Sequence, residues 1–101
     1  MILELADLEI QAGRQAEFDA AIRRGVTEVI ARAEGFLGWS VHKGVENPQR
    51  YVLQIRWRSL EDHMEGFRKS PDFTRWREIV GPFFARAPQV KHFDLLGASD
   101  A

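Results

Sequence analysis

The sequence contains no cysteine among its 101 residues. Without a thiol the chain can form no disulfide, no thiolate nucleophile, no iron–sulfur cluster and no cysteine-bound zinc site. Long apolar runs are lacking too, since no stretch approaches the roughly 20 residues that span a bilayer. The first residues carry the acid Glu4 where a secretory signal peptide would carry basic residues. We therefore expect a cytoplasmic protein with no membrane partner.

Charge of one sign does not dominate either. Lys and Arg number 14 and Asp and Glu 15, which gives a net charge of −1. The closest basic pairs, Arg23-Arg24 and Arg68-Lys69, are short and fit solvated helix faces. A protein without a basic patch lacks the electrostatic signature of nucleic-acid binding, so we expect no nucleic-acid partner.

Cofactor and metal motifs are also absent. The sequence has no Gly-rich phosphate loop, no nucleophile elbow and no dinucleotide fingerprint. Its three histidines, His42, His63 and His92, lie far apart and show no spacing typical of metal ligands. We expect neither a metal site nor a cofactor.

What the chain does contain is typical of one soluble globular domain, with 45% hydrophobic and 29% charged residues. Its length suits one domain and not two. We expect a single domain over residues 1–101, in which 97–101 form a flexible tail.

The spacing of apolar residues predicts alternating strands and helices. Turn-forming residues separate these elements, as in the Asn47-Pro48 turn that should close a hairpin and the Gly81-Pro82 helix break. The predicted elements are strands over 2–10, 36–45, 50–57 and 88–96, and helices over 15–33, 59–69 and 70–80. This β-α-β-β-α-β order, with its second helical region split, predicts an α+β ferredoxin-like fold with an antiparallel sheet.

Both faces of the predicted sheet are partly apolar. Leu3 and Leu5 lie on one face of the first strand, whereas Leu8 and Ile10 lie on the other. Helices cover only one face of such a sheet, so a second copy of the chain would cover the other. The sequence therefore predicts a homodimer.

Several short segments occur in a familiar order. They are Gly35-Phe36-Leu37-Gly38-Trp39, Tyr51-Val52-Leu53, Trp57-Arg58-Ser59 and Ser70-Pro71-Asp72-Phe73, followed by a late apolar strand. In this order and spacing the chain resembles the antibiotic biosynthesis monooxygenase domain family over nearly its whole length.

The resemblance implies a dimeric α+β barrel, in which two ferredoxin-like subunits pack sheet to sheet. Each subunit would hold a pocket between its sheet and its helices. Members of the family include oxygenases that oxidise polycyclic aromatic phenols without metal or flavin, quinol oxygenases and haem-degrading enzymes. Many members have no known substrate, and a shared fold does not fix an activity.

Trp57 ends the third predicted strand and, by the resemblance, matches a Trp that lines the pocket. Its ring could stack on a flat substrate. A buried Trp that only packs beneath a helix is an equally good interpretation.

The haem-degrading branch adds an Asn on the first strand and a His on the second helical region. The corresponding positions here are Ala6 and Arg77. Arg stays protonated and cannot ligate iron. Haem chemistry is therefore a minor alternative, unless His63 supplies the ligand from a neighbouring turn.

His63 is the candidate general base. It borders a helical stripe of Leu60, Met64 and Phe67, where it could point into the edge of a pocket with a pKa near neutrality. The alternative is a half-exposed His that flanks the core or pairs with a carboxylate.

Aromatic side chains gather between residues 51 and 84. Most should belong to the core, but the split helix could also roof an aromatic ligand while Arg77 or Arg75 holds an anionic oxygen. The candidate substrate-binding residues are Tyr51, Phe67, Phe73, Trp76, Arg77 and Phe84.

These patterns leave three hypotheses for function. The first is a cofactor-independent monooxygenase acting on a flat phenolic or quinone-like small molecule, with His63 and Trp57 as catalytic residues. The second is a non-catalytic ligand-binding or stress-associated module of the same fold. The third is haem binding or degradation. Titratable groups inside the pocket would favour the first over the second.

Overall fold

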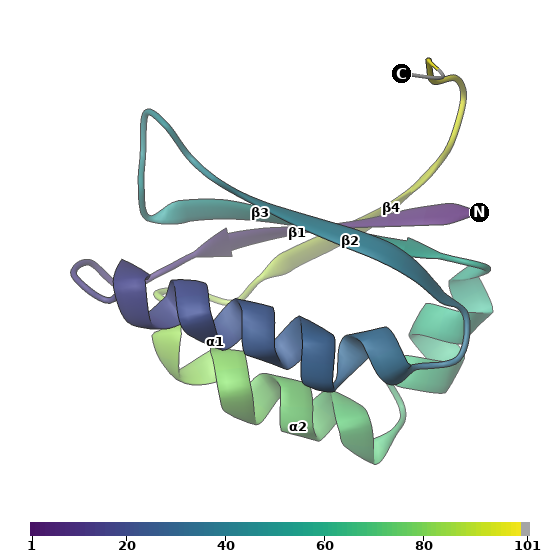
Figure 1. Cartoon of the computed structure of the whole chain (residues 1–101), viewed down its shortest axis with the longest axis horizontal. Helices are drawn as coiled ribbons and strands as arrows, with labels where there is room; N and C mark the ends of the chain where they lie inside the picture. The colour runs from purple at the N-terminus through teal and green to yellow at the C-terminus, as the bar shows by residue number, and fades with distance from the viewer. Residues whose placement is uncertain (100–101) are drawn as a thin grey trace.

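A computed structural model of the chain describes residues 1–99. A four-stranded antiparallel sheet is covered on one face by two helices that run side by side (Figure 1). The elements are β1 (Ile2–Glu9), α1 (Gln15–Glu28), η1 (Ile30–Arg32), β2 (Phe36–Lys43), β3 (Arg50–Trp57), η2 (Asp62–Phe67), α2 (Pro71–Val80), η3 (Gly81–Phe83) and β4 (Gln89–Asp94). The predicted ferredoxin-like fold is confirmed.

The strands lie in the order β2-β3-β1-β4. The two central strands pair in full, from Ile2 opposite Trp57 to Glu9 opposite Arg50. On its other side β1 pairs with β4, which places Glu4 opposite His92. The predicted hairpin of β2 and β3 is present, with a bulge between Phe36 and Gly38.

Four predicted elements are longer than the observed ones. The strand predicted over 2–10 ends at Glu9, and Ile10 forms only an isolated bridge with Phe84. The helix predicted over 15–33 ends at Glu28 and continues as the short η1. The strands predicted over 36–45 and 88–96 end at Lys43 and Asp94. The apolar residues beyond these two strand ends are exposed, with Val45 89% and Leu96 103% accessible, so they have no packing partner to extend the strands. Of the predicted tail, residues 97–99 carry no regular structure and 100–101 lie outside the described residues.

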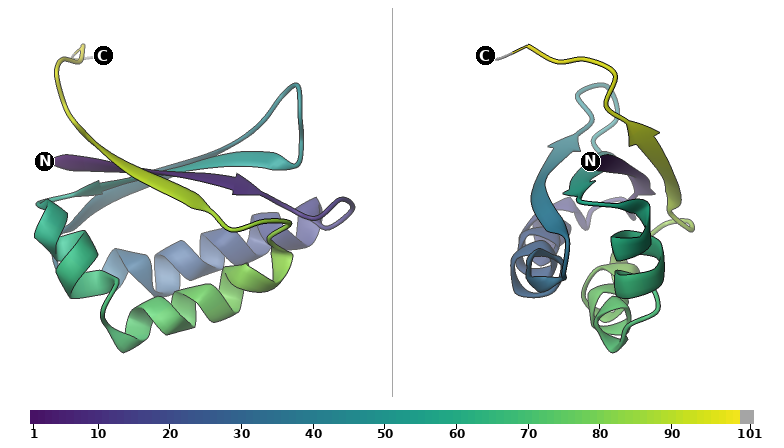
Figure 2. Two further views of the ribbon diagram at one scale, coloured as in Figure 1. Left: turned by 180° about the vertical axis from the view of Figure 1, so that it is seen from behind. Right: turned by 90° about the vertical axis from the view of Figure 1, so that its right-hand side faces the viewer.

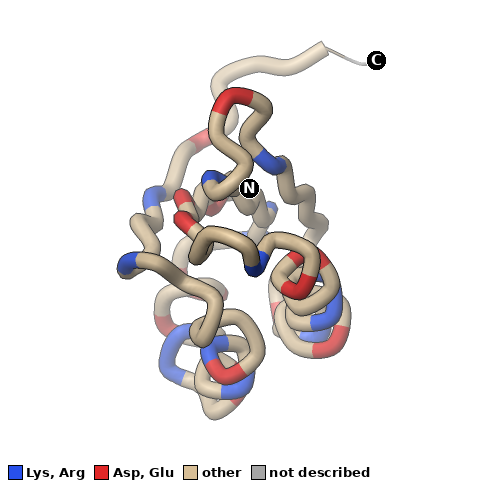
Figure 3. Tube along the Cα trace, turned by 90° about the vertical axis from the view of Figure 1, so that its left-hand side faces the viewer, with Lys and Arg blue, Asp and Glu red and all other residues tan. Residues whose placement is uncertain are grey.

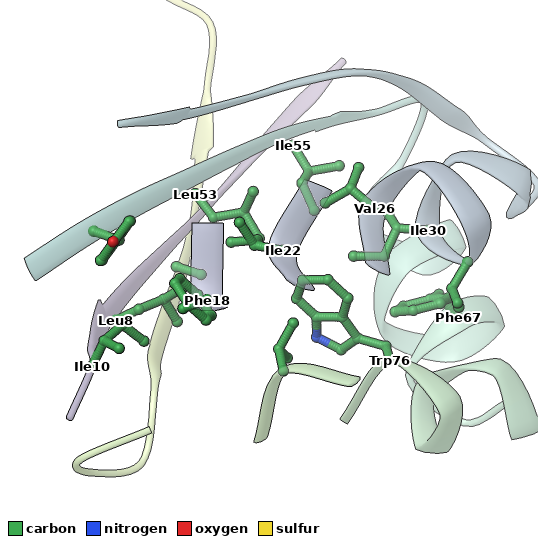
Figure 4. Close-up of a cluster of buried hydrophobic side chains, with 14 of the residues drawn as sticks. Leu8, Ile10, Phe18, Ile22, Val26, Ile30, Leu53, Ile55, Phe67 and Trp76 are labelled. Atoms are coloured by element: carbon green, nitrogen blue, oxygen red, sulfur yellow. The ribbon is translucent and has the colours of Figure 1, made fainter. Parts of the chain in front are cut away.

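The core lies between the sheet and the helices (Figure 4). Alternate residues of β3 point inward, and Leu53 and Ile55 are 1% exposed. Phe18, Ile22 and Val26 of α1 meet them at helical spacing. Burying each such side chain contributes roughly 1.5–3 kcal/mol.

A close approach between the helices sets the depth of the layer. Gly25 of α1 faces the ring of Trp76 on α2, and a Cβ at this position would lie 2.9 Å from a ring carbon. Glycine therefore allows the indole to reach the core across α1. Figure 4 shows the Trp76 ring pointing from α2 toward Val26 and Ile30.

The segment between β3 and α2 differs from the prediction. Instead of an α-helix through 69, its residues Asp62–Phe67 form a π-helix, and the Arg68 N–H donates to the His63 carbonyl. This i→i+5 bonding widens the turn and changes which side chains face inward. His63 and Phe67 are buried, whereas Leu60, which was predicted on the buried stripe, is 44% exposed.

The second face of the sheet is open, as the side views show (Figure 2). The C-terminal segment leaves β4 on this side, away from the helices. Acidic and basic residues are interspersed along the trace (Figure 3). None of the helices in the described range is long and apolar enough to cross a membrane.

Candidate functional site

A pocket of about 200 Å³ lies between the sheet and the second helical region. Strands β1, β3 and β4 form one wall, and η2 and α2 form the other. Most of its lining is apolar, but Glu4, His63, Arg68 and Arg77 also face it. An apolar pocket with a few convergent polar groups is the usual form of a small-molecule site.

Glu4 is the most unusual member of the lining. It follows the inward parity of β1, which it shares with Ala6 and Leu8, and is only 6% exposed. Its Oε1 accepts a hydrogen bond of 2.9 Å from Trp57 Nε1–H and lies 3.2 Å from His63 Nε2. Two nitrogen atoms therefore converge on one oxygen of a buried carboxyl.

His63 joins Glu4 to the edge strand. Its ring stacks on Trp57 with 5.0 Å between centroids and an interplanar angle of 16°. Its Nδ1 lies 2.7 Å from Nε2 of His92, a partly exposed residue of β4. Both ring nitrogens of His63 are thus engaged, one on each side, in a chain that runs Glu4–His63–His92.

Burial shifts the proton affinities along this chain. Desolvation raises the pKa of Glu4 to about 7, although the Trp57 hydrogen bond and Arg68 act in the opposite direction. Desolvation, with His92 and Arg68, lowers the pKa of His63 to about 4. The pKa of His92 is lowered by burial and by Arg68. Near neutral pH the carboxyl, not the imidazole, changes its charge.

Two arginines hold the positive charge of the pocket. Arg68 follows η2 and lies with its guanidinium 5.3 Å from the centre of the Phe73 ring. Arg77 on α2 lies 6.0 Å from the centre of the Phe84 ring. Each can meet an anionic oxygen of a ligand that lies against these aromatic rings.

The structure brings together most of the residues predicted from sequence. His63, Phe67, Phe73, Trp76, Arg77 and Phe84 all line the pocket. Trp57 and Tyr51 are not among the residues that line it in the described range. Trp57 is fully buried behind His63, and Tyr51, at the far end of β3, donates its O–H to Asp19. Their predicted contact with substrate stays a prediction.

Three polar residues of the pocket or of the Glu4–His63–His92 chain were missed. Glu4 could have been found, because an acid on the apolar parity of a strand is unusual. His92 carries no such signal: it meets His63 only because β4 pairs with β1. Arg68 was assigned to a solvated face, although it also borders the pocket. The described residues include no group of three or more His, Asp or Glu that could hold a metal ion.

Comparisons with known proteins agree with this architecture. The family model of antibiotic biosynthesis monooxygenase matches residues 1–79. Uncharacterized protein YczJ of Bacillus subtilis (strain 168) is 36% identical over 93 residues, which cover 92% of this chain and 97% of YczJ.

Solved structures give the same result. A Bordetella bronchiseptica protein that bears the same family name is 40% identical with a TM-score of 0.88, over 94% of this chain and 96% of that chain. SnoaB of Streptomyces nogalater, a cofactor-independent oxygenase, has a TM-score of 0.82 at 15% identity, over 99% and 97% of the two chains. At that identity SnoaB shares the fold alone. The family model and the two closer relatives show that this chain belongs to the antibiotic biosynthesis monooxygenase family.

Proposed function

We propose that this chain is a cofactor-independent monooxygenase for a small, flat phenolic or quinone-like molecule. The observation that carries the proposal is a buried carboxyl, Glu4, that faces an otherwise largely apolar pocket and has a pKa near 7. A carboxyl group whose pKa lies near neutral pH can remove a proton from a substrate and return it later in the same reaction cycle. The description of SnoaB as a cofactor-independent oxygenase supports the same reaction class.

Proton removal starts the chemistry. A phenol whose keto tautomer carries a methylene group loses a proton to the carboxylate of Glu4 and becomes an electron-rich phenolate. The phenolate passes one electron to dioxygen, and the radical pair then forms a C–O bond. The proton returns from Glu4 to give a hydroperoxide, which loses water as its O–O bond and the remaining C–H bond break. The methylene carbon supplies all four electrons, so that R2CH2 and O2 become R2CO and H2O.

The remaining lining residues hold the substrate in this proposal. Phe67, Phe73 and Trp76 provide apolar rings, and Arg68 or Arg77 pairs with the phenolate oxygen. His63 and Trp57 act through Glu4: the indole N–H and the imidazole fix the carboxyl that receives the proton. A volume of about 200 Å³ exceeds the roughly 150 Å³ of a cavity that binds benzene, so a small aromatic compound fits.

The site does not fit haem. Both ring nitrogens of His63 already face a partner, Glu4 on one side and His92 on the other, so ligation of iron would have to break one of these contacts. The pocket is also smaller than the roughly 300–1,000 Å³ typical of sites for drug-sized ligands. A binding module without chemistry would need no buried titratable group in its pocket.

The open face of the sheet supports a homodimer. Leu3 and Leu5 on β1, Val52 on β3 and Phe93 on β4 lie on the face that no helix covers. Pairing of this face between two copies would remove a row of apolar side chains from water. Light scattering should then give twice the chain mass of 11.6 kDa, and Leu5→Glu should return it to that of one chain.

Dioxygen consumption by the purified, metal-free protein tests the catalytic proposal. A panel of anthrones, hydroquinones and naphthols should include a compound that is consumed faster than its autoxidation. For that compound Glu4→Gln should lower kcat by about 10²-fold or more, the usual contribution of a general base. His63→Gln should also reduce turnover and leave the dimer intact.

Glu9→Gln provides the matched control. Glu9 lies on the same strand with the opposite parity and pairs with Arg86 outside the pocket, so its removal should leave turnover unchanged. Equal turnover in wild type and Glu4→Gln would contradict the assignment of the base. No dioxygen uptake with any compound would favour the ligand-binding module.

A further inference from the structure

We propose that Glu4, His63 and His92 form a proton relay through which the pocket carboxyl exchanges its proton with solvent at the edge of the sheet. The relay deepens the proposed function, on which its catalytic meaning rests, because it would let Glu4 change its protonation state while a ligand fills the pocket. Its three members come from β1, η2 and β4. Glu4 Oε1 lies 3.2 Å from His63 Nε2, and His63 Nδ1 lies 2.7 Å from His92 Nε2.

The ionised state of Glu4 fixes both imidazoles. A carboxylate can only accept, so Glu4 Oε1, which already accepts from Trp57 Nε1–H, favours a proton on His63 Nε2, the ring nitrogen that lies 3.2 Å away. A neutral His63 with its proton on Nε2 has a bare Nδ1, so the 2.7 Å contact requires that His92 donates from its own Nε2. In this state the unprotonated Nδ1 of His92 is the outermost atom of the relay.

Protonation of Glu4 reverses every bond in the chain. A proton on Oε1 is donated to His63 Nε2, and His63 must then carry its proton on Nδ1 and donate to His92 Nε2. His92 keeps a proton only on its Nδ1. The two states differ by one proton in total, and that proton enters or leaves at His92, which is partly exposed on the edge strand.

The surroundings keep the middle of the chain neutral. His63 is 3% exposed, and its low pKa means that a full positive charge on its ring is unfavourable at neutral pH. Arg68, which follows η2, is the positive group whose field reaches Glu4, His63 and His92 alike. Arg77 faces the same pocket from α2. Proton transfer through His63 therefore requires that one ring nitrogen gains a proton while the other ring nitrogen loses one.

Nitrogen-15 NMR of the histidine rings across a pH titration tests the relay without any substrate. As the pH rises through the titration of Glu4, the protonated nitrogen of His63 should change from Nδ1 to Nε2. The protonated nitrogen of His92 should change from Nδ1 to Nε2 at the same midpoint. His42, exposed on β2, lies outside this chain of contacts and is the internal reference.

Two variants sharpen the test. In Glu4→Gln the oxygen must still face Trp57 Nε1–H, which can only donate, so His63 should stay protonated on Nε2 at every pH. In His92→Gln the amide can still pair with His63 but cannot pass a proton on, so exchange of the His63 ring N–H with water should slow. His42→Gln should leave that exchange unchanged.

A His63 ring that keeps one tautomer throughout the wild-type titration would overturn the relay, and so would unchanged exchange in His92→Gln. The relay and the enzyme activity can fail separately. A tautomer change without dioxygen uptake would keep the relay and reject the oxygenase, whereas uptake without a tautomer change would do the reverse.

Discussion

Two carboxyl groups at opposite ends of β3 receive a hydrogen bond from an aromatic side chain, yet their pKa values shift in opposite directions. Glu4 accepts from Trp57 and its pKa is raised to about 7. Asp19 accepts from the Tyr51 hydroxyl at 2.5 Å and from Lys43 Nζ at 2.6 Å. Burial alone would raise the pKa of Asp19, but these two hydrogen bonds outweigh it and lower the pKa.

The pKa values of the two groups shift in opposite directions because Asp19 is better hydrated than Glu4 and has a cationic partner. The side chain of Asp19 is 27% exposed and has an ammonium partner, whereas that of Glu4 is 8% exposed and has none in direct contact. A paired, hydrated carboxylate holds its charge and serves as a structural anchor. A desolvated one without a cation changes charge near neutral pH, which is what proton transfer requires.

Removal of the two aromatic donors should give the largest effect. Trp57→Phe leaves the buried carboxyl without its indole donor, which costs about 1–3 kcal/mol of stability and raises the pKa of Glu4 further. Tyr51→Phe should cost at most about 1 kcal/mol, because water and Lys43 still reach Asp19. Urea unfolding at pH 8 measures both free energies of unfolding. Equal losses of unfolding free energy in the two variants would mean that the deeper burial of Glu4 does not make its hydrogen bond more important than that of Asp19.

The pH dependence of stability should separate the same two groups. The pKa of Glu4 rises on folding from 4.5 to about 7, so its contribution to the free energy of unfolding falls as the pH rises through that range. The pKa of His63 falls from 6.5 to about 4, so its contribution rises with pH over 4–6.5. The two slopes oppose each other in the wild type between 4.5 and 6.5.

Single variants should expose each slope in thermal or urea unfolding. Glu4→Gln should become more stable as the pH rises from 4 to 6.5, and His63→Gln should become less stable from 4.5 to 7. Asp19→Asn is the control: because the pKa of Asp19 is lowered from 3.8, its stabilisation is lost only in more acidic solution. A wild-type slope retained in Glu4→Gln would contradict the raised pKa.

The smallest effect should come from salt. Lys43 is exposed, and at about 1 M ionic strength the screening length falls to about 3 Å, so the pKa of Asp19 should rise toward its ordinary value. The pKa of Glu4 should change less, because its shift comes mainly from desolvation. Carbon-13 NMR of the two carboxyl groups at low and high salt measures both. Lys43→Met should reproduce the salt effect on Asp19 alone.

The fold could be predicted because it depends on local patterns. Alternation in 50–57 and helical spacing around Phe18 and Ile22 gave the correct element types and order. The same reasoning placed Phe73, Trp76 and Arg77 on one helix, where they do line the pocket.

The chemistry of the site could not be predicted in the same way. The contact between His63 and His92 joins residues 29 apart in sequence and depends on the pairing of β4 with β1. The raised pKa of Glu4 depends on how completely side chains from other elements exclude water. The spacing of residues in the sequence indicates neither the contact between the two histidines nor the exclusion of water from Glu4.

The π-helix at Asp62–Phe67 has a consequence for how such a site can arise or disappear. A turn closed by i→i+5 bonds holds one residue more than an α-helical turn, so deletion of one residue would restore ordinary winding. Because each α-helical residue turns the chain by about 100°, such a deletion would change the direction of the His63 ring relative to the segment on the other side of the deleted position. In evolutionary terms, a change in length at this single position offers a route to lose the proposed relay without substitution of Glu4, His63 or His92.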